Sequence, residues 1–200
     1  NSFTKKEAAV KIKSKKLFKN PFAELPTEIA ILSSISFFVA VGFGLIIPAL
    51  PIFASSFGVS KTAIGLIISS FAIVRFSSGL VAGKFVDKFG ERSVLGFGLF
   101  MVSFFTLLTA LAQSYEQLLI FRSLGGLGSS MFSVSAGSLL MRSVGDDFRG
   151  RAQSLFNGGF LLGGITGPAF GGILSAISLR APFFVYSTTL AIAGAIALFF

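Results

Sequence analysis

Six long apolar runs dominate this 200-residue sequence and constrain its fold more than any other feature. Each is close to the roughly 20 residues that a helix needs to cross a bilayer. Only 12% of the residues are charged, and no alternating pattern of a membrane β-barrel is present, so helices are the spanning element that fits. The sequence therefore predicts an all-α membrane protein, a six-transmembrane-helix bundle, with spans at about 29–52, 62–83, 93–112, 117–141, 153–178 and 182–200.

Lysine and arginine are unevenly distributed between the two sides of this bundle. Residues 1–27 form a basic tail with seven lysines, and the second and fourth loops carry three basic residues each, whereas the opposite side has only Lys61 and Arg180. The positive-inside rule then places the N-terminus in the cytoplasm of a multi-pass protein of the cell (inner or plasma) membrane, with residues 28–200 as the membrane unit. The tail either enforces this topology or also binds anionic lipid. The net charge of +9 thus indicates membrane orientation and not nucleic-acid binding.

The sequence also excludes several kinds of chemistry. It contains no cysteine and no histidine, which removes thiolate nucleophiles, imidazole bases and the common zinc clusters. Glycine clusters such as Gly125-Gly126-x-Gly128 lie inside apolar spans, where a phosphate-binding loop does not fit. We therefore expect no enzyme activity, no metal and no cofactor.

The second predicted loop packs glycines, an acid and bases into a tight turn. Gly83 is expected to let the second helix approach a neighbour closely, and Gly90 to adopt a positive φ. Asp87 is expected to accept hydrogen bonds from free N–H groups at a helix start, and Arg92 to pair with it. With Lys88, these residues form a candidate gating latch, whose charge pairs are made in one state and broken in another. The alternative is a basic loop that only sets topology.

Two arginines lie inside predicted spans, where a charge costs free energy and marks a functional candidate. Arg75 is near the middle of the second span and shares a predicted close-packed face with Gly79 and Gly83. We expect it to line a transport cavity, contacting cargo or pairing with an acid; a structural ion pair is the alternative. Arg122 lies just inside the outer end of the fourth span, and either acts in coupling or snorkels to the headgroups.

Small residues recur at i+4 spacing on two spans, which suits close helix packing. On the fifth span, Pro168 cannot donate a hydrogen bond to the carbonyl of Gly164, so a kink or loosening is expected there. A generic glycine face for helix pairing is the alternative to a specific motif. The small residues are Gly125, Ser129, Ser133 and Gly137 on the fourth span, and Gly159, Gly163, Gly167 and Gly171, with Gly172 beside them, on the fifth.

These motifs resemble, in the correct order, those of the major facilitator superfamily. The second loop is similar to G-x-x-x-D-R-x-G-R-R-x-x-L, although Lys88 replaces an arginine and Glu91 replaces a base. The fourth span is similar to R-x-x-Q-G-x-G from Arg122 on, with Gly125 in place of glutamine. The fifth is similar to G-x-x-x-G-P-x-x-G-G, which within that superfamily marks the drug:proton antiporters. The matching positions are Gly83, Asp87, Gly90, Arg92 and Leu95, then Gly126 and Gly128, then Gly163, Gly167, Pro168, Gly171 and Gly172.

The resemblance implies the N-terminal half of a major facilitator fold, itself a 3+3 repeat. It implies a secondary transporter that exports small amphipathic or hydrophobic cargo by alternating access, coupled to protons. The C-terminal six helices are then expected on a longer chain or from a second copy of this one. All eight acids lie in the tail, in loops or at span edges, so the coupling carboxylate is expected elsewhere. The other functions that we consider are export of sugars or other polar metabolites, and a non-transporting half-size membrane subunit.

Overall fold

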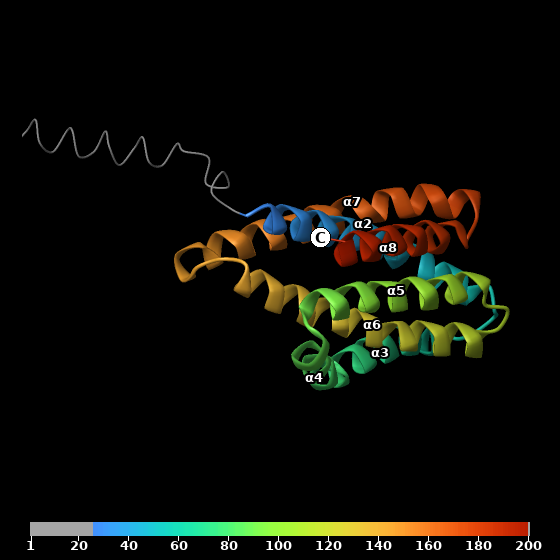
Figure 1. Cartoon of the computed structure of the whole chain (residues 1–200). Helices are drawn as coiled ribbons and strands as arrows, with labels where there is room; N and C mark the ends of the chain where they lie inside the picture. The colour runs from blue at the N-terminus through green and yellow to red at the C-terminus, as the bar shows by residue number, and fades with distance from the viewer. Residues whose placement is uncertain (1–25, 200) are drawn as a thin grey trace, which may run out of the picture.

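A computed structural model describes residues 26–199, which fold into a bundle of long helices (Figure 1). The all-α fold predicted from the sequence is confirmed. Almost all of the predicted basic tail, residues 1–25, lies outside the described residues, as does Phe200. Within 26–199 the elements are α2 (Thr27–Ser55), α3 (Lys61–Ser77), α4 (Gly79–Phe89), α5 (Glu91–Leu111), α6 (Tyr115–Arg142), the 3₁₀ helix η1 (Asp146–Phe148), α7 (Arg149–Ile177) and α8 (Ala181–Phe199).

Five predicted spans agree with helices α2, α5, α6, α7 and α8 to within a few residues, and each of these is long and apolar enough to cross a membrane. The second predicted span, 62–83, is divided between α3 and α4, which meet at a 45° bend and together are apolar enough to form one span. The bend lies at Ser78, whose hydroxyl donates to the carbonyl of Val74 at 2.6 Å. Serine back-bonding next to a glycine, here Gly79, is a known cause of helix bends.

The helices form two layers, α2 with α7 and α8, and α3/α4 with α5 and α6 (Figure 1). α2 packs mainly on α7, and α6 packs on α3; α2 also packs on α8, and α6 on α5. In a 3+3 repeat, spans one, two and three correspond to spans four, five and six. The α2–α7 contact then corresponds to the α6–α3 contact, and the α2–α8 contact to the α6–α5 contact, as observed. The contact between α5 and α8 joins the two layers.

The core lies between the layers and consists of large apolar side chains, whereas the outside is apolar as well. Leu99, Leu118 and Phe183 are completely buried, but Phe76 and Leu80 are more than four-fifths exposed. A helix that is apolar on its outer face is stable when lipid surrounds it. The exposed side chains therefore agree with a membrane-embedded bundle.

Charged residues gather at the two ends of the bundle. One end, which we call the basic end, contains the start of α2, the α4–α5 turn, the α6–α7 connection and the end of α8 (Figure 1). The opposite end carries Lys61 and Arg180. The placement of the basic end in the cytoplasm remains a prediction from the charge distribution. The basic end carries Lys84, Lys88, Arg92, Arg142, Arg149 and Arg151.

Candidate functional site

The α4–α5 turn is as tight as predicted, because Gly90 alone separates the two helices. Its φ of 81° confirms the positive value expected of this glycine. Asp87 and Lys88 are exposed in the last turn of α4, and Lys88 Nζ lies 5.2 Å from the centre of the Phe89 ring. Among residues 26–199, Asp87 makes no hydrogen bond to a helix start, so that expectation is wrong.

Gly83 does not bring α4 close to a neighbouring helix, contrary to prediction. Within the described part of the chain, no atom lies within 4 Å of the position that a Cβ would take at Gly83. The bend at Ser78 is the physical reason, since it turns α4 so that Ala82 and Val86 face the bundle instead.

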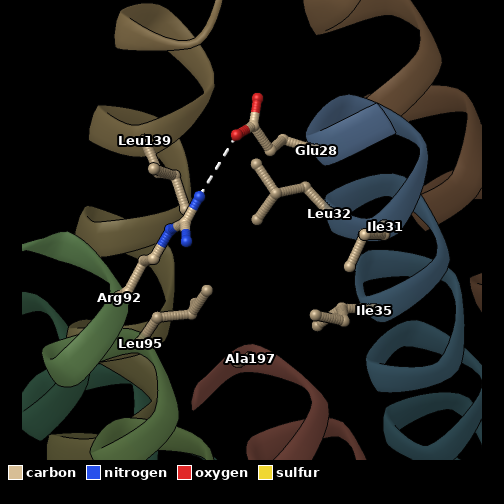
Figure 2. Close-up of a pocket in the computed structure, with 8 residues that line it drawn as sticks. All are labelled: Glu28, Ile31, Leu32, Ile35, Arg92, Leu95, Leu139 and Ala197. Atoms are coloured by element: carbon tan, nitrogen blue, oxygen red, sulfur yellow. Dashed lines mark hydrogen bonds and ion pairs between the residues drawn. The ribbon is translucent and has the colours of Figure 1, made fainter. Parts of the chain in front are cut away.

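Arg92 pairs with Glu28 and not, as predicted, with Asp87. Figure 2 shows the Arg92 side chain reaching from α5 across to α2, where Nη2 lies 3.2 Å from Oε1 of Glu28. The positive φ of Gly90 places Arg92 in the first turn of α5, facing α2, while Asp87 stays on the exposed side of α4. Both side chains of the pair are about half exposed, 48% for Arg92 and 47% for Glu28.

The neighbouring Glu91 makes a second ion pair, with a residue of α6 instead of α2. Its Oε1 lies 2.9 Å from Nη1 of Arg142 at the end of α6 and accepts a hydrogen bond from Ser138 Oγ at 3.2 Å. In the sequence Glu91 stands out only as a departure from the motif; its position beside basic residues of the same end was the available signal for this pair. We call these two pairs, Glu91–Arg142 and Glu28–Arg92, the α5 clamp, since they tie the start of α5 to both layers.

The crevice beside Arg92 is too small for cargo. It lies between α2, α5, α6 and α8, below the ion pair in Figure 2, and its volume is about 20 Å³. That is room for about one water molecule. The clamp is thus a contact between helices and not a binding pocket.

Arg75 is half-buried and faces α6. Its Nη2 donates to Ser133 Oγ at 2.8 Å. This contact is one of a row of polar contacts that joins the second span to α6. Within residues 26–199 it makes no ion pair, so the structural ion pair that we considered is absent there. The close-packed face predicted with Gly79 and Gly83 is wrong, because both glycines are open after the bend. The other contacts of this row are Ser123 Oγ to Ser70 Oγ and Ser78 Oγ to Ser130 Oγ, both at 2.8 Å.

Arg122 is buried, with only 5% of its surface exposed, and therefore does not snorkel. Its guanidinium carbon lies 4.1 Å from the centre of the Phe71 ring and 5.8 Å from that of Phe43. Its Nε has no hydrogen-bond partner among the described residues, and no carboxylate in that part of the chain pairs with it. A buried charge without an anion is costly, and the cation–π contacts offset only part of that cost.

The close packing of α6 uses glycines other than the predicted stripe. A Cβ at Gly126 would lie 2.7 Å from the carbonyl oxygen of Phe71, and one at Gly128 would lie 2.6 Å from that of Gly98. A Cβ at Gly125 would meet only ordinary contacts, and one at Gly137 would meet no atom of residues 26–199 within 4 Å. The reason is that α6 is packed on two sides, by α3 and by α5, and each side takes one glycine.

The glycine stripe on α7, in contrast, lies where it was predicted. It packs backbone to backbone on α2, where a Cβ at Gly167 would lie 2.5 Å from the carbonyl oxygen of Val41, and Cβ atoms at Gly163 and Gly171 would collide with those of Phe37 and Leu45. Pro168 also faces α2, next to Gly44, and α7 continues through it as one helix. We call this contact the α2–α7 seam.

The last glycine of the motif, Gly172, faces away from the seam. No described atom lies within 4 Å of the position that its Cβ would take. The predicted residues therefore form three separate parts: the α5 clamp at the basic end, two arginines on or beside the α3–α6 contact, and the α2–α7 seam.

Comparison with known families decides the identity of this architecture. The family model described as Major Facilitator Superfamily matches residues 32–200. The chain belongs to the major facilitator superfamily. The family places this chain among transporters and not among enzymes, as the sequence predicted.

Major facilitator proteins of known function are similar to this chain over only part of their length. The mouse synaptic vesicular amine transporter is 41% identical over 107 residues, which are 52% of this chain and 20% of that protein. Multidrug resistance protein 2 of Bacillus subtilis (strain 168) is 28% identical over 181 residues, 90% of this chain and 45% of that protein. The quinolone resistance protein NorA of Staphylococcus aureus (strain N315) is 26% identical over 153 residues, 74% and 38% respectively.

Solved major facilitator structures have the same fold. A bacterial homologue of the human lysosomal transporter Spinster, in an inward-facing unoccupied conformation, superposes with a TM-score of 0.76 at 19% identity, over 86% of this chain and 42% of that one. The human organic anion transporter MFSD10 gives 0.73 at 19% identity, over 86% and 46%. The chain thus spans less than half the length of the relatives that it matches, which agrees with one six-helix half of the fold.

Proposed function

We propose that this chain forms the N-terminal half of a transporter that exports small amphipathic or hydrophobic compounds by alternating access. The observation that carries the proposal is the α2–α7 seam, in which Gly163, Gly167 and Gly171 of the antiporter-type motif pack directly on α2. Relatives named for multidrug and quinolone resistance support export as the direction. Cargo would bind near the middle of the membrane, between this half and a second set of six helices.

The α2–α7 seam has the geometry of a seal. Its two helices touch through backbone atoms, so no side-chain movement opens a gap between them. Rocking of this half against the other one then changes access to the cargo site, while the seam prevents a leak within the half. The flat glycine surface also lets α7 slide slightly on α2 without breaking interlocked side chains.

The α5 clamp has the geometry of a latch at the basic end. An exposed pair such as Glu28–Arg92 contributes at most about 1 kcal/mol, so a rocking motion can break it at little cost. Glu91 is only 14% exposed, and its pair with Arg142 is the firmer of the two. The Glu91–Arg142 pair therefore keeps α5 and α6 together, while the weaker Glu28–Arg92 pair lets the start of α2 shift relative to α5.

Arg122 is the residue that we assign to coupling. It is a buried cation between α2, α3 and α6, with no anion in the described part of the chain. Each acid within residues 26–199 is near a helix end or in the α6–α7 connection. We therefore assign to Arg122 a carboxylate partner outside these residues, whose protonation would release the pair and couple proton entry to cargo exit.

Ethidium efflux from cells that express the naturally encoded protein tests this function. Expression should speed the loss of ethidium, and a protonophore should abolish the difference. The Arg122→Met variant should also fail to speed ethidium loss, and Arg122→Lys, which keeps the positive charge, should retain part of the effect. Efflux equal to that of cells without the protein would contradict export; efflux that persists with the protonophore or in Arg122→Met would contradict the coupling.

A further inference from the structure

An open groove runs along the outer surface of the bundle between α2 and α8. Its volume is about 600 Å³, within the roughly 300–1,000 Å³ typical of sites for small organic ligands. On α2 it extends from Ala30 to Phe38, about 12 Å at 1.5 Å per residue. Phe38 and Ile192 are half exposed at its walls, 50% and 56%, while Ile35 and Ala193 are buried at its floor. The groove therefore opens to the surroundings of the helices and not to the interior of the bundle.

The groove is suited to hydrocarbon and not to a polar ligand. Its two hydroxyl groups already donate hydrogen bonds to their own helices: Ser34 Oγ to the carbonyl of Ala30 at 2.8 Å, and Thr189 Oγ1 to that of Val185, also at 2.8 Å. All its other lining side chains are apolar. A flexible chain of methylene groups satisfies such a surface, and the lipid around a membrane-spanning helix supplies it at high concentration.

Positive charge lies where the groove reaches the basic end. The groove and the crevice of Figure 2 share Ile31 and Ile35, and Arg92 lines that crevice. The Arg92 side chain is half exposed, 48%, and its Nη2 contacts Glu28. In the sequence, the 25 residues before the described part carry seven lysines and two acids. Each basic group near the membrane surface favours an anionic headgroup.

We propose that the α2–α8 groove binds one acyl chain of an anionic phospholipid, whose headgroup lies at the basic end near Arg92. This lipid would fill the gap between the first and last spans and support α8. α8 packs on α2 less extensively than α7 does, and otherwise depends on α5. The inference does not depend on what the transporter carries, although the headgroup contact that it assigns, Arg92, also belongs to the α5 clamp.

Two adjacent threonines of α8 provide a matched test of the groove. Thr189 lines the groove and Thr188 does not, although both hydroxyls donate to a carbonyl four residues earlier. The naturally encoded protein is placed in nanodiscs that contain phosphatidylglycerol with a photoreactive diazirine near the end of one chain. After irradiation, labelled peptides are quantified by mass spectrometry. Thr189→Trp should lower labelling of the α2 and α8 groove peptides several-fold, and Thr188→Trp should leave it unchanged.

A second pair of variants tests the headgroup. Arg92→Gln and Glu28→Gln break the same ion pair, but only the first removes the positive charge. Loss of one basic group should lower the preference for phosphatidylglycerol over phosphatidylcholine about fivefold in Arg92→Gln, whereas Glu28→Gln should keep or increase it. The proposal would be overturned by equal labelling in the two threonine variants, by labelling spread evenly over the outer helices, or by a preference that Arg92→Gln does not change.

Discussion

Gly163 and Gly164 are neighbours on α7 with opposite surroundings, which makes them a sharp test of the α2–α7 seam. A Cβ at Gly163 would lie 2.9 Å from both Ala40 Cβ and Val41 N and would collide with the carbonyl oxygen of Phe37. At Gly164 nothing lies within 4 Å among the described residues. Alanine at the first position must push two backbones apart, whereas at the second it meets no obstacle.

The expected free energies follow from these contacts. Overpacking costs about 1–3 kcal/mol, and the upper value applies at Gly163 because the colliding atoms are backbone. Alanine in place of glycine stabilises a helix by about 1 kcal/mol. Gly163→Ala should therefore lower the free energy of unfolding by about 2 kcal/mol, and Gly164→Ala should raise it by about 1 kcal/mol, a difference of about 3 kcal/mol.

Both variants are compared with the unaltered protein by reversible denaturant titration in mixed micelles, with helical circular dichroism as the signal. Efflux measured in the same variants reports on function: Gly163→Ala should leak or lose transport, and Gly164→Ala should retain it. If Gly163→Ala is as stable as the unaltered protein, the helices are not in backbone contact there, and the seam as described is refuted.

Three other predictions concern the turn, the clamp and the buried arginine. Gly90→Ala places a side chain at a φ of 81° and should cost about 1–3 kcal/mol of unfolding free energy; an unchanged value would contradict the turn. In a double-mutant cycle, the Glu28–Arg92 pair should give a coupling free energy of less than about 1 kcal/mol. The double variant with the two charges exchanged should regain the stability that each single variant loses. If it regains none, the pairing is contradicted. Arg122→Met would leave the carboxylate that we assign to Arg122 buried without a partner, so it should lower the free energy of unfolding of the whole protein by about 3–5 kcal/mol while it abolishes transport. A stabilised Arg122→Met would contradict the assignment of an anionic partner to the guanidinium.

The sequence predicted the spans well, because hydropathy and length depend on the bilayer and not on neighbouring helices. It missed the bend at Ser78, although Ser77-Ser78-Gly79 is a sequence that commonly bends helices. It also predicted the α7 stripe correctly, since four glycines at i+4 spacing leave only one face for a neighbour. The stripe predicted on α6 was wrong because α6 is packed on two sides. The i+4 spacing alone does not say which glycine contacts which neighbouring helix.

Ion-pair partners were the least predictable part of the site. Asp87 is closer to Arg92 in sequence than Glu28 is, but α2 and α5 meet in space only after the whole bundle has formed. The Glu91–Arg142 pair depends in the same way on the contact between α5 and α6. The turn geometry at Gly90 was predictable because it depends on one residue. The ion-pair partners were not predictable, since they depend on the tertiary fold.

Transport by the purified protein tests the central claim most directly. The naturally encoded protein is reconstituted into liposomes with an acidic lumen, and external ethidium is followed by fluorescence. Ethidium should accumulate inside, nigericin should release it by collapsing the pH gradient, and liposomes with the Arg122→Met variant should not accumulate it. Accumulation equal to that of protein-free liposomes would contradict the claim that this major facilitator chain belongs to a proton-coupled exporter of amphipathic compounds.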